Sequence, residues 1–223
     1  SCRLMKPRTG GGAVTLSNIS TNRIYGLAGG SVLNNVDNAI SGAGEIGVNG
    51  NLTLKNRSVI DANATTALVI DAAQPVQNTG TLRSANHAAG NGGLVLSGTT
   101  IDNTGAGNSG LITAIGANTH VDLAGSTIKG GTITTAGGGV LNSFGSSTFD
   151  GTAGVVTITA GSTIQVNNST NLNLAGTIAA KTTSLQSQKT TNGKSQDRLS
   201  DRLTTVEANM RKQYTALDTK MAS

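Results

Sequence analysis

His120 and Asp122 are the residues whose types and spacing come nearest to a chemical site. The sequence has only two histidines, His87 and His120. A spacing of two places His120 and Asp122 on one face of a strand, where a histidine and a carboxylate can bind a metal ion or transfer a proton. Such a pair is more often part of a solvent-facing polar surface, so we predict no catalytic residue and no metal ligand here.

Clustered carboxylates would be the mark of a polysaccharide-cleaving enzyme built from stacked β-structure, often together with calcium or a paired Arg or Lys. The carboxylates outside that pair are instead far apart in the sequence, as in Glu45, Asp61, Asp71, Asp102 and Asp150. We therefore predict that the protein is not an enzyme. Because folding can bring distant residues together, an enzyme acting on polysaccharide stays open as the alternative.

Two glycine-rich stretches match the dinucleotide-binding pattern G-x-G-x-x-G: "GAGEIG" (42–47) and "GAGNSG" (105–110). The pattern binds a pyrophosphate only where it joins a strand to the N-terminus of a helix. Both stretches continue into strand-like sequence, and 31 glycines make chance matches common. We predict no cofactor.

Short runs with alternating apolar residues fill the chain up to about residue 175. Period two is typical of strands, and Gly, Asn or Ser closes each run, as sharp turns require. The runs include the apolar pairs Leu52 and Leu54, Leu94 and Leu96, Val121 and Leu123, Val156 and Ile158, and Leu172 and Leu174.

The runs also repeat. Four stretches share a glycine or serine turn, hydroxyl residues and an apolar residue: "LSGTTIDNTG" (96–105), "LAGSTIKGGT" (123–132), "FGSSTFDG" (144–151) and "TAGSTIQVNN" (159–168). Their apolar residues, Ile101, Ile128, Phe149 and Ile164, are expected to point inward from successive coils of a stacked β-architecture. A β-sandwich is the alternative, but its core normally holds more aromatic bulk than two Phe, two Tyr and no Trp.

Composition sets further limits. Charged residues make up 12% of the chain, and Val, Ile and Thr are frequent, which argues against a disordered chain. The single cysteine, Cys2, excludes an internal disulfide. No run approaches the ~20 apolar residues of a membrane span. No secretory leader is visible, so a fragment, a mature form and a leaderless export substrate all stay open.

The last part of the chain has a helical pattern. Gly193 is the only glycine after Gly176, and residues 181–223 carry 8 basic and 4 acidic side chains. We expect a helix from about residue 196 to the end, a weaker one over 177–189, and a weak break near 190–195. Charges of both signs alternate there and no aromatic stacking platform accompanies them, so we predict no nucleic-acid binding.

Seven apolar residues of this tail follow one another at spacings of three or four, which places them in one stripe on a helix. We predict that this apolar stripe is a helix–helix interface; an amphipathic helix packed on the last coil is the alternative. The apolar stripe consists of Leu199, Leu203, Val206, Met210, Tyr214, Leu217 and Met221.

Residues 10–175 resemble large bacterial surface exoproteins. The resemblance rests on "GSVLNNVDNAISGAGEIGVNGNLTLKNRSVIDAN", "NTGTLRSAN" and the Gly-Ser-Thr-Ile turns. These are similar to filamentous-haemagglutinin-like and autotransporter-passenger proteins. The resemblance implies a right-handed parallel β-solenoid on the outside of a bacterium.

Residues 176–223, with "GTIAAKTTSLQSQ" and "QDRLSDRLTTVEANMRKQYTALDTKMAS", resemble the C-terminal segment of the flagellar filament-capping hook-associated protein. The resemblance implies a helical leg that assembles into a ring and contacts flagellin or hook-junction proteins. Lys189 and Asn192 depart from the apolar residues that the family tends to have there.

Together these observations predict a mainly β protein. A right-handed parallel β-solenoid over 10–175 follows a ragged start (1–9) and precedes an amphipathic helical tail (176–223). The expected function is non-enzymatic: an extracellular structural or adhesion protein at the bacterial surface or flagellar tip. Its expected partners are further copies of itself through the tail, flagellin or hook-junction proteins, or host-surface glycans or proteins. An artificial or fragmentary fusion without a single function also stays open.

Overall fold

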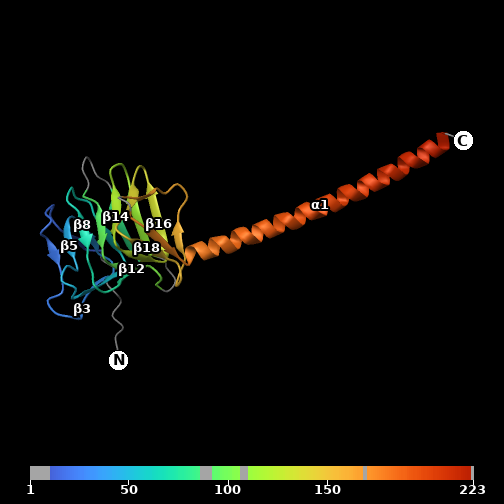
Figure 1. The fold of residues 1–223 in the computed structure, drawn as a ribbon. Coiled ribbons are helices and arrows are strands. Elements are labelled where there is room, and N and C mark those ends of the chain that lie inside the picture. The colour runs from blue at the N-terminus through green and yellow to red at the C-terminus, as the bar shows by residue number, and fades with distance from the viewer. Residues whose placement is uncertain (1–10, 86–91, 106–109, 168–169, 222–223) are drawn as a thin grey trace, which may run out of the picture. The chain divides into compact units, whose positions relative to one another are not determined.

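The structure, a computed structural model, describes residues 11–85, 92–105, 110–167 and 170–221, and within the tail helix it describes side chains from Gly193 onward. The predicted ragged start (1–9), His87 and most of the stretch 105–110 lie outside the described residues. Two compact units make up the chain, Ser1–Thr177 and Ile178–Ser223. The first unit contains all the described strands, and the second consists of helix (Figure 1).

Three parallel sheets of seven strands each form the first unit. Sheet A contains β1 (Ala13–Thr15), β4 (Ala39–Ser41), β7 (Val59–Asp61), β10 (Thr81–Ala85), β13 (Leu111–Ile115), β16 (Gly131–Ala136) and β19 (Val156–Ile158). Sheet B contains β2 (Arg23–Ile24), β5 (Gly44–Ile46), β8 (Leu68–Ile70), β11 (Leu94–Ser97), β14 (His120–Ala124), β17 (Val140–Phe144) and β20 (Ile164–Val166). Sheet C contains β3 (Ser31–Asn35), β6 (Leu52–Asn56), β9 (Val76–Asn78), β12 (Thr100–Asp102), β15 (Thr127–Lys129), β18 (Ser147–Asp150) and β21 (Leu172–Ala175).

Each inner strand pairs in parallel with the third strand before it and the third strand after it in the chain, and the strands that end a sheet pair on one side only. One coil therefore contributes one strand to each sheet, and seven coils stack into a parallel β-solenoid. Backbone N–H and C=O groups of each coil bond to the coils above and below, so the stack satisfies its own hydrogen bonds. The predicted fold class, a mainly β solenoid followed by a helix, is confirmed.

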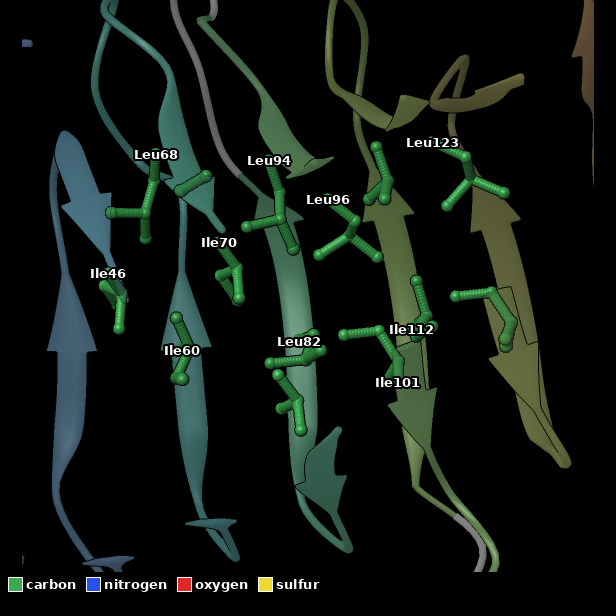
Figure 2. Packing of buried hydrophobic residues seen from close by; sticks show 14 of the residues in the cluster. Ile46, Ile60, Leu68, Ile70, Leu82, Leu94, Leu96, Ile101, Ile112 and Leu123 are labelled. Carbon is green, nitrogen blue, oxygen red and sulfur yellow. The ribbon is translucent and has the colours of Figure 1, made fainter. Parts of the chain in front are cut away.

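Apolar side chains fill the interior in columns that run from coil to coil. In sheet A, Ile60, Leu82 and Ile112 are register partners on successive strands, and all three are fully buried. Figure 2 shows these side chains in line across the strands. A thin core of this kind needs branched aliphatic residues of similar size rather than aromatic bulk, which explains the composition.

The predicted alternation is confirmed in the middle coils. Leu52, Leu54, Leu94, Leu96, Val121 and Leu123 are all buried. In the last coil the pattern weakens, because Ile158 and Leu174 are each 43% exposed. They lie in β19 and β21, which end their sheets, so each has a neighbouring strand on one side only.

The repeated turn has a structural reason. Its first hydroxyl is buried in Thr99, Ser126 and Ser147, and the Ser126 Oγ donates a hydrogen bond of 2.7 Å to the carbonyl oxygen of Leu96. The backbone N–H of Thr99 donates in turn to the Ser126 Oγ at 3.3 Å. The hydroxyl thus links neighbouring coils at a corner where the backbone leaves the ladder.

The fourth copy of the repeat lies at a different corner of its coil from the other three. Ile101, Ile128 and Phe149 form one column in sheet C, as expected, but this column continues at Leu174. Ile164 lies in sheet B, opposite Leu141. Its turn has the same hydroxyl chemistry at a different corner, and its distance of 15 residues from Phe149 is too short for a coil.

Buried asparagines form a second ladder inside the solenoid. The Nδ2 of Asn35 donates to the Oδ1 of Asn56 at 2.8 Å, Asn56 donates likewise to Asn78 at 2.9 Å, and Asn78 to Asn103 at 2.8 Å. All four side chains are at most 2% exposed. Because the amides of Asn56, Asn78 and Asn103 each accept from the coil before, this polar corner is buried with most of its hydrogen bonds made. The Oδ1 of Asn35, where the ladder begins, is buried without a partner.

The stretch 42–47 serves a corner rather than a cofactor. Gly44 begins strand β5 with φ at +125°, and a Cβ there would collide with the backbone oxygen of Asn22 on the preceding coil. Glycine is required by both the backbone angle and the close approach. A strand follows this stretch, so it lacks the helix that a dinucleotide-binding loop needs.

The second unit contains the helix α1 (Thr177–Met221). The helix passes without interruption through Gly193 and the segment 190–195, where the sequence suggested a weak break. A glycine inside a helix costs only about 1 kcal/mol, which does not by itself end a helix. Glu207 and Arg211 form an i,i+4 ion pair at 2.8 Å on this helix. Among the described residues, no helix is long and apolar enough to cross a membrane.

Candidate ligand-binding groove

The outward face of sheet C carries a column of polar and charged side chains. Strands in this sheet alternate between buried apolar and solvent-facing positions, and parallel register aligns the solvent-facing ones from coil to coil. The outer column of sheet C is, in order, Asn34, Lys55, Gln77, Asp102, Lys129 and Asp150.

The two lysines of the outer column have different neighbours. Lys129 lies between Asp102 and Asp150 on the flanking strands. Lys55 lies between the neutral residues Asn34 and Gln77. Neighbouring strands are about 4.8 Å apart, close enough for opposite charges to interact. The charge of Lys129 is therefore balanced within the column, and that of Lys55 is not.

The carboxyl of Asp150, near the end of the outer column, is held mainly by the turn that follows it. Its Oδ1 accepts hydrogen bonds from the Thr152 hydroxyl and the Thr152 backbone N–H, at 2.5 and 3.0 Å. These two bonds, and then the nearby charge of Lys129, hold the pKa of the Asp150 carboxyl below its ordinary value, against an opposing contribution from desolvation. The ionised form of this carboxyl is thus stabilised at the last position of the outer column.

A concave groove of about 540 Å³ lies over the part of the outer column where charge is unbalanced. Three successive strands supply its walls. Strand β6 contributes Lys55, with Arg57 just after it; the next two strands contribute Gln77 and Asp102. The polar groove is lined by Lys55, Arg57, Gln77, Thr79, Asp102, Thr104 and Gly105.

The groove has a basic side and an acidic side. Lys55 is half-buried and Arg57 is exposed, and neither makes an ion pair with any other described residue. On the opposite side, the Oδ1 of Asp102 accepts hydrogen bonds from the Thr104 hydroxyl and backbone N–H, at 2.5 and 2.9 Å. These bonds fix the carboxylate in place and leave its second oxygen available.

The structure places His120 and Asp122 on the same face of β14, as their spacing predicted. The His120 Nδ1 lies 3.0 Å from the Asp122 Oδ1, which also accepts a 2.9 Å hydrogen bond from the Asn142 Nδ2. Asn167 donates to Asn142 at 3.3 Å. The imidazole ring lies against the backbone of Gly93 on the preceding coil. The pair is thus one end of a polar ladder that crosses three coils.

The other candidate carboxylates remain separate. Glu45 pairs with Arg23 at 3.1 Å, and Asp61 pairs with Arg83 at 2.8 Å. Within the described part of the chain, no three His, Cys, Asp or Glu residues lie close enough together to hold a metal ion. The polysaccharide-cleaving alternative therefore gains no support from these residues, and the absence of enzymatic activity stays a prediction.

The apolar stripe lies on the exposed surface of α1. Its seven side chains are between 48% exposed, at Met210, and 78% exposed, at Met221. Threonines off the stripe donate their hydroxyls to carbonyl oxygens one turn earlier, as Thr204 does to Ser200 at 3.0 Å. The predicted interface residues thus share one helix face, and their role in association stays a prediction.

Sequence reasoning missed the polar groove. The alternation in "LTLKNR" already placed Lys55 and Arg57 on an outer face, and "TID" did so for Asp102. Their meeting depends on the length of the intervening coils, which the repeats did not define. The signal that could have found the groove is the register of buried apolar columns, counted coil by coil.

Comparison with known proteins identifies no relative, because the chain matches no protein-family model, no curated protein and no solved structure. The β-solenoid is shown by the strand pairing alone. The resemblances to filamentous-haemagglutinin-like exoproteins and to the flagellar cap rest on the residues that suggested them.

Proposed function

We propose that this protein is a non-enzymatic structural and adhesion protein of the bacterial exterior. In this proposal the solenoid is a stalk with a repetitive surface, and the helical tail joins copies of the protein to one another. The observation that carries the proposal is the exposed apolar stripe of α1, because a stripe of seven large apolar side chains in water calls for a partner.

The stalk part of the proposal follows from how the solenoid is stabilised. Each coil contacts mainly the coils before and after it, so length can increase without a larger core. The outer faces of the three sheets then present solvent-facing side chains at the regular spacing of the strands. A surface of this kind suits contact with extended or repetitive partners, such as host-surface glycans or proteins.

The tail part follows from the energetics of a lone helix. Isolated helices are marginal in water and gain most of their stability by packing an apolar face. Burial of a Leu, Val or Met side chain contributes roughly 1.5–3 kcal/mol. Several residues of the apolar stripe, buried together, are enough to hold a dimer or a larger bundle.

The flagellar resemblance adds candidate partners for the same face. Flagellin or hook-junction proteins would offer helices of complementary pattern, and a location at the bacterial surface or flagellar tip would bring them together. Self-association is the first expectation, since a second copy of the chain always presents a matching apolar stripe.

Sedimentation of the full chain tests the proposal. The wild type is expected to be an oligomer at micromolar concentration. The variant carrying Leu203→Asp and Val206→Asp is expected to be a folded monomer, because two charges cannot be buried in an apolar interface. A matched control carries Thr204→Asp and Thr205→Asp, which add the same charges beside the stripe, and it should stay oligomeric.

A wild type that is monomeric at every accessible concentration would contradict self-association. Dissociation of the control to the same extent would show that added charge, and not loss of the apolar stripe, separates the copies.

A further inference from the structure

We infer that the polar groove on sheet C binds an acidic glycan, with Lys55 and Arg57 holding its carboxylate or sulfate group and Asp102 accepting from its hydroxyls. This inference names a ligand class for the adhesive part of the proposed function and rests on it. It uses no residue of the helix.

The two cations of the groove are the first argument. Lys55 and Arg57 project from one coil, two residues apart, so they share an outward face. Neighbouring coils leave them unbalanced, whereas Lys129 in the same outer column is flanked by two carboxylates. Two adjacent cations in a concavity favour an anion, and a guanidinium can hold a carboxylate or sulfate through two parallel hydrogen bonds.

The acidic side of the groove narrows the ligand class. Asp102 lines the groove and is held by Thr104 through its Oδ1, so its Oδ2 is the carboxylate oxygen that those two bonds do not use. A ligand that places an anionic group against this carboxylate would meet repulsion. A ligand with an acidic group at one point and hydroxyl donors further along would satisfy both sides.

The residues between the basic and acidic sides of the groove, and the size of the groove, agree with a sugar chain. Gln77 and Thr79 offer both donors and acceptors between the charged sides. The rows of Lys55 and Asp102 are two coil spacings apart, about 10 Å, so the ligand extends across three strands. A ligand of this length that offers hydroxyl groups along it is a chain of linked sugar units.

Other anionic partners fit less well. Nucleic acids bind to grooves that combine cations with aromatic stacking platforms, and no aromatic residue lines this groove. An acidic peptide would bring several carboxylates and few hydroxyl donors to Asp102. A neutral glycan would leave Lys55 and Arg57 without a counter-charge.

Titration calorimetry with the full-length protein tests this inference. The probes are an oligogalacturonate, which carries carboxylates, and a chondroitin sulfate oligosaccharide, which also carries sulfates. Methyl-esterified oligogalacturonate is the neutral counterpart. We expect at least one acidic probe to bind, and we expect esterification to weaken binding of the galacturonate about tenfold or more if carboxylates are recognised.

Three variants locate the binding site. Lys55→Ala and Arg57→Ala should each weaken binding of the acidic probe about tenfold. Lys129→Ala is the matched control, because it removes the same charge from the same outer column outside the groove, and its binding should stay within about twofold of wild type. Circular dichroism of all three should match wild type, since these side chains are not part of the core.

The inference is overturned if neither acidic probe binds, if all three variants weaken binding equally, or if a polyglutamate peptide binds as well as the glycans. Sedimentation of the same samples separates this from the proposed function. An oligomeric protein without glycan binding would overturn the ligand and leave the assembly role standing, while a monomeric protein that binds would do the reverse.

Discussion

The solenoid and the helix solve the burial of apolar side chains in opposite ways. In the solenoid, Leu96 and Ile101 are fully buried by the coils on either side of them. In the helix, Leu203 and Leu217 remain more than half exposed. A stack of coils provides its own partners because every coil repeats the face that its neighbour needs, whereas one helix has an apolar stripe and nothing of its own to cover it. The contrast predicts different responses to the same substitutions.

Truncation of a core leucine should give the largest effect. Leu96→Ala leaves a cavity in a column between Ile70 and Leu123, and we expect the free energy of unfolding of the solenoid to fall by about 2–5 kcal/mol. Leu203→Ala, the same change in the apolar stripe, should leave solenoid unfolding within about 0.5 kcal/mol of wild type. Urea denaturation, with the β-signal of circular dichroism as readout, measures both; an equal loss in the two variants would break the comparison.

A polar residue of the interior should come next. Asn78→Ala removes the Nδ2 that donates to Asn103 and the Oδ1 that accepts from Asn56, and both of these partners stay buried. The Asn56 Nδ2 keeps its bonds to the carbonyl oxygens of Ser58 and Thr81, but the Asn103 Oδ1 loses its donor. Leaving a buried polar group unsatisfied costs about 1–3 kcal/mol, so the urea midpoint should fall clearly. The control is Gln77→Ala, on the exposed side of the same strand, which is expected to change stability by less than about 0.5 kcal/mol.

If Asn78→Ala were as stable as wild type, the ladder would be replaceable, and the interior would depend on apolar columns alone. The contrast between the two units would then depend only on whether apolar side chains are covered, as they are in the solenoid, or exposed, as they are in the helix.

The strand pattern, and with it the fold, was predictable because it is local. Leu52 and Leu54 alternate with polar residues within one run, and glycines that the corners require, such as Gly44, stand in the sequence at the ends of runs. Neither feature depends on knowing which coils are neighbours.

The register was harder to predict because coil length varies. Column partners are 20 residues apart at Ile40 and Ile60 but 30 apart at Leu82 and Ile112. A turn motif alone therefore does not define the column, since Ile164 of the fourth copy lies in sheet B and the other three residues lie in sheet C. The polar groove was missed for the same reason. Lys55 and Asp102 lie two strands apart in sheet C, on either side of Gln77, and the two coils between them differ in length.

The helix shows the converse limit. Spacings of three and four identified one face of α1, and all seven apolar residues of that stripe are exposed. What covers the stripe is a property of another surface, and no pattern within residues 199–221 specifies it. Sequence periodicity predicts which face needs a partner, and only an association experiment can name the partner.

The smallest expected effect concerns Asp150, where the solenoid arranges charge on its surface as well as apolar groups inside. The pKa of this carboxyl is lowered in the folded state, first by the hydrogen bonds from Thr152. A depressed folded-state pKa contributes stability that is fully present above the unfolded value and is lost as pH falls through the folded value. Thr152→Ala removes the hydroxyl donor, so the pKa of Asp150 should rise toward its ordinary value, while Lys129→Ala should raise it less. Titration of the Asp150 carboxyl by NMR measures both shifts, and a larger rise with Lys129→Ala would show that the charges of the outer column, rather than the local turn, control this carboxylate.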